Sequence, residues 1–382
     1  MPIHARFVQP VIASYRVPFF RALARSGVDV EVWGDLHPRQ GSIDSTASDP
    51  EFRCVDAPHR TFGPASWQPG MARAARTPGA DVLVMSGNAR QLHVVPALKA
   101  ARRAGLPTLL WMHGTGRTGS RVGAVLRRRM CGWATGFVCY SERVRGELER
   151  EGIDRSRLFV APNSVDQQSI QAAVAAWTGD PTRLDRFRQE HDLAGKTAIL
   201  YLSRLEREKR PDLILEAVAA LRDHGDTQVL YIGKGSMREE LEALARRLGL
   251  AARVRFLGAI YKDDEIAPWA LSSSMLVHPG AIGLTVLHAF GFGLPVITAN
   301  ASAPHGPEFD AISDGQNGLV IPPGDAAALS NCIGRLLDDR AYLTKLATNA
   351  RATVTGPRGY SIEGMVRGYR EAFDAVIARR GA

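Results

Sequence analysis

The chain has 382 residues, of which 45% are hydrophobic and 23% are charged. This length suggests two domains of ordinary size, and the apolar content is too high for a disordered chain. No apolar stretch reaches the roughly 18–20 residues that a transmembrane helix requires. Charged residues and proline interrupt the first segment where a signal peptide has its apolar core, so we expect a cytoplasmic protein.

The net charge of +9 is unevenly distributed. Residues 1–170 hold 23 Lys and Arg against 14 Asp and Glu, whereas the remainder holds 25 of each kind. The whole excess therefore belongs to the first half, which indicates two domains that meet different partners. The four cysteines form no C-x-x-C pair and have no metal spacing, so we expect reduced thiols and no metal site.

Short apolar runs alternate with helical patterns, which is typical of parallel α/β sheets. In the first half the predicted strands cover residues 5–8, 28–33, 81–85, 108–112, 136–140 and 158–161. Helices are predicted over 89–103 and 141–151, the second with Ser141 as its N-cap.

A polar stretch at 165–185 interrupts this alternation, which then resumes. The predicted strands of the second half cover 198–203, 228–232, 254–257, 275–278, 295–298 and 319–321. Predicted helices cover 212–222, 237–248, 285–292, 326–338, 341–353 and 362–379. We therefore expect one domain over 1–170, a second over 171–360, and a helix over 361–382 that packs back towards the first domain.

The loop after the strand at 198–203 carries two cations at a strand-to-helix turn. Arg204 follows the strand directly and Lys209 lies five residues later, just before a helix. Two such cations can bind a diphosphate, and a solvated charge run on a surface loop is the alternative.

Two further loops carry glycines at strand ends. Gly233 and Gly235 allow a ligand to approach the backbone or simply form a tight turn, and Ser236 with Glu239 predicts a capping box for the next helix. After the strand at 275–278, a glycine-bearing loop leads into a helix beginning near Leu284, whose free amides could bind phosphate. His288 in that helix reaches ribose hydroxyls or is a core histidine hydrogen-bonded to the backbone.

His113 and Glu308 are the remaining polar candidates. His113 ends an apolar strand beside glycines, so it faces a ligand or serves as a turn residue. Glu308 follows Pro307 and suits either a general base or a helix N-terminal acid. The chain has no Asp-x-Asp, H-E-x-x-H, G-x-S-x-G or P-loop motif, which argues against dinuclear metal, serine hydrolase and P-loop chemistry.

Six segments, taken in order, resemble the signatures of the family 4 glycosyltransferases, retaining enzymes of the GT-B fold. They are residues 161–166 (A-P-N-S-V-D), 203–209 (S-R-L-E-R-E-K), 232–241 (I-G-K-G…R-E-E-L), 256–258 (F-L-G), 291–297 (G-F-G-L-P-V-I) and 307–318 (P-E…D-G-Q-N-G). The resemblance implies an α/β protein with two Rossmann-like parallel-sheet domains facing across a cleft. The first domain would bind the acceptor and the second the nucleotide sugar.

The resemblance also implies site roles. Arg204 and Lys209 would bind and stabilise the departing donor diphosphate, and His113 would touch the transferred sugar near the reacting carbon. The remaining donor contacts would come from Gly233, Gly235, Leu257 and Gly258 near the base, and from Gly283, Leu284 and Thr285 at the diphosphate.

The sequence departs from the family pattern at two places. The usual E-x7-E motif reads G-x7-H here, with Gly280 and His288 at its ends, as in some branches of the family. His288 would then take the ribose contact and Glu308 part of the missing carboxylate's role. Arg16 stands where a Gly-Gly loop often approaches the donor phosphates, and we expect its charge to substitute for that loop.

The resemblance therefore implies a retaining, metal-independent transfer of a sugar from a nucleoside diphosphate sugar to a glycan or polyprenyl-linked glycan, without a cofactor. The alternatives are a nucleotide-sugar epimerase of GT-B architecture and a glycosyltransferase with a soluble small-molecule acceptor. A nucleic-acid-binding module is disfavoured, because aromatic residues make up only 7% of the chain and do not alternate with basic ones.

A basic amphipathic segment in the first half indicates an anionic membrane surface at the inner face of the plasma membrane, or an acceptor, as its partner. The alternative is a helix that buries its apolar face in its own domain. Its cations are Arg117, Arg121, Arg127, Arg128 and Arg129.

Overall fold

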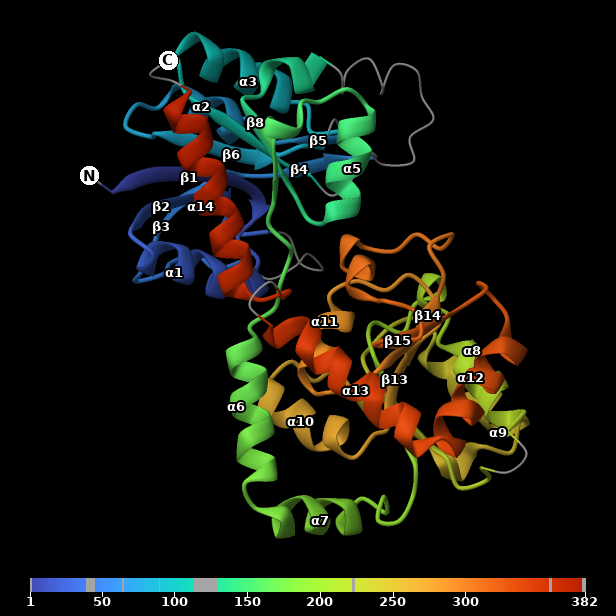
Figure 1. The fold of residues 1–382 in the computed structure, drawn as a ribbon. Coiled ribbons are helices and arrows are strands. Elements are labelled where there is room, and N and C mark those ends of the chain that lie inside the picture. Colours follow the sequence, from blue (N-terminus) through green and yellow to red (C-terminus); the bar gives the residue numbers. More distant parts are fainter. Residues whose placement is uncertain are drawn as a thin grey trace. The chain divides into compact units, whose positions relative to one another are not determined.

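The structure, a computed structural model, describes residues 2–38, 45–63, 65–88, 90–112, 129–221, 224–356 and 359–379. It divides into two compact units, shown in Figure 1. Unit 1 comprises Met1–Val165 together with Ile362–Ala382, and unit 2 comprises Asp166–Ser361. The division falls before Asp166 rather than after residue 170, and the last helix lies in unit 1.

Unit 1 contains a seven-stranded parallel sheet in the order β3-β2-β1-β6-β7-β8-β9. Its strands are β1 (Ile3–Val11), β2 (Val28–Asp35), β3 (Arg53–Asp56), β6 (Val82–Ser86), β7 (Thr108–Met112), β8 (Gly136–Cys139) and β9 (Leu158–Val160). A short antiparallel hairpin, β4 (Arg60–Phe62) with β5 (Ala65–Trp67), lies outside this sheet. The order reverses between β1 and β6, which are adjacent strands.

Helices cover both faces of this sheet. Successive side chains of a strand point to opposite faces, so the apolar residues of a central strand enter two separate cores. On β1, Phe7 joins the core under α1 (Val17–Arg25) and α14 (Ile362–Ala378), whereas Val8 joins the core on the other face. That second core includes α2 (Gly70–Arg76), α3 (Val94–Arg103) and α5 (Glu142–Arg150). The terminal helix α14, red in Figure 1, packs against α1, β8 and β9.

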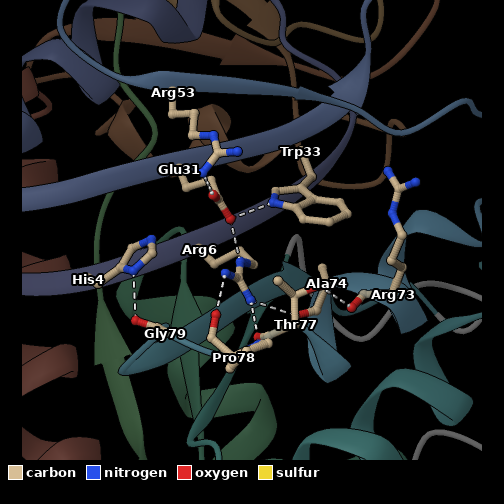
Figure 2. A network of polar contacts seen from close by, with 10 residues as sticks. All are labelled: His4, Arg6, Glu31, Trp33, Arg53, Arg73, Ala74, Thr77, Pro78 and Gly79. Atoms are coloured by element: carbon tan, nitrogen blue, oxygen red, sulfur yellow. Dashed lines mark hydrogen bonds and ion pairs between the residues drawn. The ribbon is translucent and has the colours of Figure 1, made fainter.

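A buried ion pair crosses from β1 to β2 in unit 1 (Figure 2). Arg6, 1% exposed, donates from Nε to Oε1 of Glu31 at 2.5 Å, and Trp33 Nε1 donates to the same oxygen at 2.7 Å. The remaining guanidinium nitrogens of Arg6 donate to the carbonyls of Ala74, Thr77 and Pro78. Burial raises the pKa of Glu31, but the hydrogen bonds from Trp33 and Arg6 outweigh it and leave that pKa below its usual value. Arg6 therefore has a counter-charge inside the fold, a carboxylate whose other oxygen lies 3.2 Å from Nη1 of the exposed Arg53.

Unit 2 contains a six-stranded parallel sheet in the order β12-β11-β10-β13-β14-β15. The strands are β10 (Ala198–Leu202), β11 (Gln228–Ile232), β12 (Val254–Gly258), β13 (Met275–His278), β14 (Val296–Ala299) and β15 (Gly318–Ile321). Here the order reverses between β10 and β13.

The helices of unit 2 also form two layers. One core joins the sheet to α8 (Asp212–Ala219), α9 (Arg238–Arg247), α12 (Ala326–Asp338) and α13 (Arg340–Thr355). The short helix α11 (Thr285–Gly291) and α10 (Asp263–Leu271) pack against α6 (Gln167–Thr178), which is followed by α7 (Pro181–Glu190).

The polar stretch at 165–185, for which no element was predicted, contains all of α6 and the first part of α7. Ser141 caps α5 as predicted, since its Oγ accepts from the N–H of Val144 at 3.2 Å. Among the described residues, no helix is long and apolar enough to cross a bilayer.

Candidate donor site in unit 2

The predicted donor residues of unit 2 gather at the carboxyl ends of neighbouring parallel strands. Arg204 and Lys209 follow β10, and the loop at 279–284 follows β13, so they flank the point where the strand order reverses. In open parallel sheets this reversal leaves a crevice in which ligands bind. The two loops are also in contact, because the Ala281 N–H donates to the Glu208 carbonyl at 3.1 Å.

Lys209 is half-buried and joins these two loops. Its Nζ donates to the carbonyl of Ala281 at 2.5 Å, which uses one of its three N–H donors. Burial lowers the pKa of Lys209, and the positive charge of Arg204 lowers it further. The negative charge of a bound anion would oppose both effects and raise the pKa of Lys209.

Arg204 is the exposed member of the pair of cations. Its side chain is 71% exposed and lies 3.6 Å from Oε1 of Glu208. Its own carbonyl accepts a hydrogen bond from the Tyr201 hydroxyl at 2.8 Å, which fixes the backbone at the strand end while leaving the guanidinium in solvent. Arg204 is therefore anchored by its main chain and able to turn toward a ligand.

Gly233 and Gly235 are required by backbone packing. A Cβ on Gly233 would lie 1.9 Å from the Ser203 carbonyl oxygen, and one on Gly235 would lie 2.3 Å from that of Leu205. The loop that follows β11 thus packs directly on the loop that carries Arg204. The Gly233 N–H also donates to the Gly258 carbonyl at 2.7 Å, which ties these glycines to the end of β12, where Leu257 and Gly258 lie.

The predicted capping box at Ser236 is wrong. The helix α9 begins at Arg238 with Met237 as its N-cap and without a side-chain cap. Ser236 instead donates from Oγ to Glu206 Oε2 at 2.7 Å, and its N–H donates to Oε1 at 3.2 Å. Glu206 therefore takes the hydrogen bonds of Ser236 that the prediction gave to Glu239. The close approach of Gly235 to Leu205 brings the loop that carries Glu206 next to Ser236.

Gly280, where the family's first glutamate usually stands, has no room for a side chain. A Cβ there would lie 2.4 Å from the carbonyl carbon of Lys209 and 2.5 Å from the Glu208 oxygen. A carboxylate at this position would displace the backbone of Lys209. The glycine therefore gives close packing of the two loops in place of a sugar contact.

Glu308 lies in a short 3₁₀ helix, Pro307–Ala311, and is 5% exposed. A Cβ on Gly283 would be 3.6 Å from its Oε2, and one on Gly306 would be 2.5 Å from the same atom. The carboxylate thus faces the loop that follows β13. Leu284 precedes α11 as its N-cap residue, and Thr285 donates from Oγ1 to the Leu202 carbonyl at 3.0 Å, which connects the start of that helix to β10.

His288 lies on α11 beside α10. Its Nε2 is 3.8 Å from Oδ1 of Asp263, whose Oδ2 accepts from the Ser169 hydroxyl at 2.7 Å. Burial lowers the pKa of His288 and the Asp263 carboxylate opposes that shift. The neighbouring carboxylate is a partner that neither sequence interpretation of His288 included.

Two further histidines of unit 2, the buried His278 and the partly buried His305, were not predicted as site residues. His278 ends β13, is 1% exposed and stacks on Tyr201, and neither ring nitrogen has a hydrogen-bond partner among the described residues. Burial lowers the pKa of His278 to about 3, and the charge of Lys209 contributes. His305 accepts from the Ile282 N–H at Nδ1 (3.2 Å), so its Nε2 carries the proton and donates to the Asn300 carbonyl at 2.9 Å. Strand-end position was the signal that could have identified His278.

The predicted residues of unit 1 are only partly described. Arg16 follows β1, is 8% exposed and lines a cavity within that unit. His113, Arg117, Arg121, Arg127 and Arg128 lie outside the described residues, and Arg129 is exposed.

Two family models match the chain. The glycosyl transferase 4-like domain matches residues 12–164, and the model of glycosyl transferases group 1 matches residues 182–353. These ranges fall in unit 1 and unit 2 respectively, and together they leave only short segments unmatched.

Similar proteins agree with this result. The exopolysaccharide phosphotransferase of Streptomyces coelicolor is 28% identical over 81% of this chain, which spans only 30% of that protein's length. The D-inositol 3-phosphate glycosyltransferase of Frankia alni is 29% identical over 74% of this chain and 73% of its own. A crystal structure of Anabaena HepE in complex with UDP covers 98% of this chain and 100% of its own, with a TM-score of 0.73 and 17% identity. The chain thus combines a glycosyl transferase 4-like domain and a domain of the glycosyl transferases group 1, on the GT-B fold of its structural neighbours.

Proposed function

We propose that this glycosyltransferase moves a sugar from a nucleoside diphosphate sugar to a glycan or lipid-linked glycan, with retention and without a metal. The observation that carries the proposal is the pair of cations at the reversal of the unit 2 sheet. Lys209 is fixed there by Ala281, while Arg204 remains free to turn. A diphosphate is the ligand whose charge and size suit two cations on one loop.

In this proposal the two cations act on the bond that breaks. Negative charge grows on the diphosphate oxygen as it leaves the anomeric carbon, and Arg204 and Lys209 stabilise that charge. One unit charge at 4 Å is worth about 4 kcal/mol at an effective dielectric near 20, against about 8–23 kcal/mol by which enzymes lower barriers. Since these cations do the work that a divalent ion does elsewhere, no metal is required.

Retention would follow if the acceptor attacks from the face that the diphosphate leaves. The departing phosphate oxygen then accepts the acceptor's proton, so that no enzymic nucleophile is needed. Gly280, which leaves no room for a carboxylate beside Lys209, is compatible with this route, and the nearby Glu308 carboxylate contacts the donor sugar in this proposal.

The test begins with the donor. Structures of HepE contain UDP, UDP with glucose, or UDP-glucose, so uridine nucleotides are the first probes, followed by GDP- and dTDP-sugars. A matching donor at 100 times its Kd should stabilise the chain by about 2.7 kcal/mol, equally with and without EDTA. No stabilisation by any nucleotide sugar would contradict the donor proposal, and loss of the effect in EDTA would contradict metal independence.

Product analysis tests the remainder. Proton NMR of the transferred sugar should show the anomeric configuration of the donor. Inverted configuration would contradict retention, and conversion of the donor sugar to an epimer without any acceptor would contradict transfer.

A further inference from the structure

A cavity of about 230 Å³ lies within unit 1, at the carboxyl ends of β1, β6 and β7. It therefore lies where the order of the unit 1 sheet reverses, the position at which open parallel sheets bind ligands. The polar and aromatic residues of its lining that matter here are Gln9, Tyr15, Arg16, Gln91 and Trp111. This lining includes one formal charge, that of Arg16.

Arg16 is held among neutral groups. Its Nη1 donates to Gln9 Oε1, its Nη2 to the Tyr140 hydroxyl at 2.9 Å, and its Nε to the Tyr15 hydroxyl at 3.1 Å. The guanidinium also lies over the ring of Trp111, 4.2 Å from the centroid. These contacts orient the group, but none of them neutralises it.

The contrast with Arg6 shows what is missing. Both arginines come from β1 or the turn that follows it, and both are at least nine-tenths buried. Arg6 has the carboxylate of Glu31 at 2.5 Å (Figure 2), whereas no carboxylate among the described residues forms an ion pair with Arg16. A buried charge without a counter-charge costs several kcal/mol, and arginine does not deprotonate to avoid that cost.

Unpartnered polar atoms line the same cavity. Gln9 Nε2, Gln91 Oε1 and Trp111 Nε1 are buried and have no hydrogen-bond partner among the described residues. Gln9 is oriented by Arg16, because a guanidinium only donates, so its carbonyl oxygen must face Arg16 and its amide nitrogen remains a donor. Arg16 itself uses three of the five N–H donors that a guanidinium carries. The cavity thus offers two unpartnered N–H donors, on Gln9 and Trp111, and one unpartnered acceptor, on Gln91, around a positive charge that no described carboxylate neutralises.

We infer that this cavity binds an anionic group of the acceptor, a carboxylate or a phosphate, and that Arg16 is the residue that selects it. The planar fork of arginine suits both anions. This assignment differs from the donor-phosphate role that the family resemblance implied for Arg16. It rests on the proposed function, in which the donor diphosphate has its own cations, Arg204 and Lys209, in unit 2. Acidic sugars and sugar phosphates are accordingly the acceptor class.

The test compares a charged and a neutral sugar that differ only at C6, with inorganic phosphate as a second anion. Methyl β-D-glucuronide and inorganic phosphate should bind the full chain in calorimetric titration, and methyl β-D-glucoside should bind at least about tenfold more weakly. Equal binding of glucuronide and glucoside, or binding of neither anion, would overturn the inference.

Two variants locate the anion. Gln9→Glu places a carboxylate on Arg16 in the position of the amide, so the chain should remain folded and bind either anion at least about tenfold more weakly. Arg16→Gln should lose the same binding, while Arg103→Gln, an equal charge change at the exposed end of α3, should not. Undiminished anion binding in folded Gln9→Glu would overturn the assignment to this cavity.

Two comparisons of nucleotide binding with glucuronide binding decide whether the cavity serves the donor or the acceptor. If Gln9→Glu weakens UDP binding as much as glucuronide binding, the cavity serves the donor and the inference is wrong, while the proposed function stands. If no nucleotide binds the natural chain but glucuronide does, the proposed function fails and the anion site stands.

A last variant tests for a counter-ion of Arg16 within the chain. Asp44 lies outside the described residues, so Asp44→Asn is included. Tenfold tighter glucuronide binding in this variant would identify Asp44 as that counter-ion and overturn the inference.

Discussion

The two sheets place cationic side chains at the same topological position but hold the charges differently. In unit 2, Arg204 is exposed with Glu208 nearby, and Lys209 has a carbonyl as partner. In unit 1, Arg16 is buried among a glutamine, two tyrosines and a tryptophan. The unit 2 cations are stable without a ligand because solvent and a carboxylate screen them. The unit 1 cation is the one whose environment requires an anion.

The largest change in the free energy of unfolding is expected from two variants that remove the carboxylate partner of Arg6 or add one to Arg16. Glu31→Gln removes the counter-charge from Arg6 and should lower the free energy of unfolding by about 3–5 kcal/mol. Gln9→Glu supplies a counter-charge to Arg16 and should leave that free energy unchanged or raise it. Urea unfolding of both variants measures the difference.

Equal losses of stability in Glu31→Gln and Gln9→Glu would break the comparison. That result would mean that Arg16 is already neutralised in the folded chain. Glu216→Gln, an exposed residue of α8 in unit 2, provides the control for a simple loss of one carboxylate.

An intermediate effect is expected at the loop contact that positions Lys209. Gly280→Ala places a Cβ 2.4 Å from a backbone carbon, so the chain should lose about 1–3 kcal/mol of stability. Gly283→Ala on the same loop meets only Glu308 Oε2 at 3.6 Å, an ordinary contact, and should cost far less. Thermal unfolding compares the two, and similar Tm values would show that the loops separate easily.

The change that is smallest per pH unit is a pH dependence of stability that arises from the strand-end histidine of unit 2. The pKa of His278 is about 3 in the folded chain and near 6.5 when unfolded, so below about pH 6.5 the unfolded state binds the extra proton. Stability should therefore fall as pH drops from about 6.5 toward 3, by at most about 1.4 kcal/mol per pH unit. His278→Phe, which keeps a ring against Tyr201, should reduce this slope, and an unchanged slope would show that His278 does not titrate in this way.

Short apolar runs in the sequence were enough to predict most of the strand residues of the two sheets. The strands β7, β11 and β13 begin and end where the apolar runs predicted, because buried parallel strands consist of almost continuous apolar residues. The edge strand β3 was missed, since Arg53 and Asp56 give it no apolar run. Helix α6 was missed because the stretch at 165–185 was interpreted only as a polar interruption between the two domains.

At the candidate site, the sequence predicted features that depend on neighbouring residues and missed contacts between distant loops. The sequence indicated Arg204, Lys209 and the glycine loops, because their spacing is local and typical of the family. It did not indicate that Gly280 packs on Lys209, that Ser236 binds Glu206, or that Arg16 has no carboxylate partner in the part of the chain that the structure describes. Those facts depend on which distant loops the sheet order brings together.

The most direct test of the account is the rate of sugar transfer, or of donor hydrolysis, in Lys209→Met beside Arg207→Met. Both variants remove one positive charge from the same loop, but Arg207 is 77% exposed and paired with Glu240. We expect Lys209→Met to lose about 10²–10³-fold in rate with an unchanged Tm, and Arg207→Met to keep nearly the full rate. Comparable rates in the two variants would contradict the claim that the cations at the sheet reversal stabilise the leaving diphosphate.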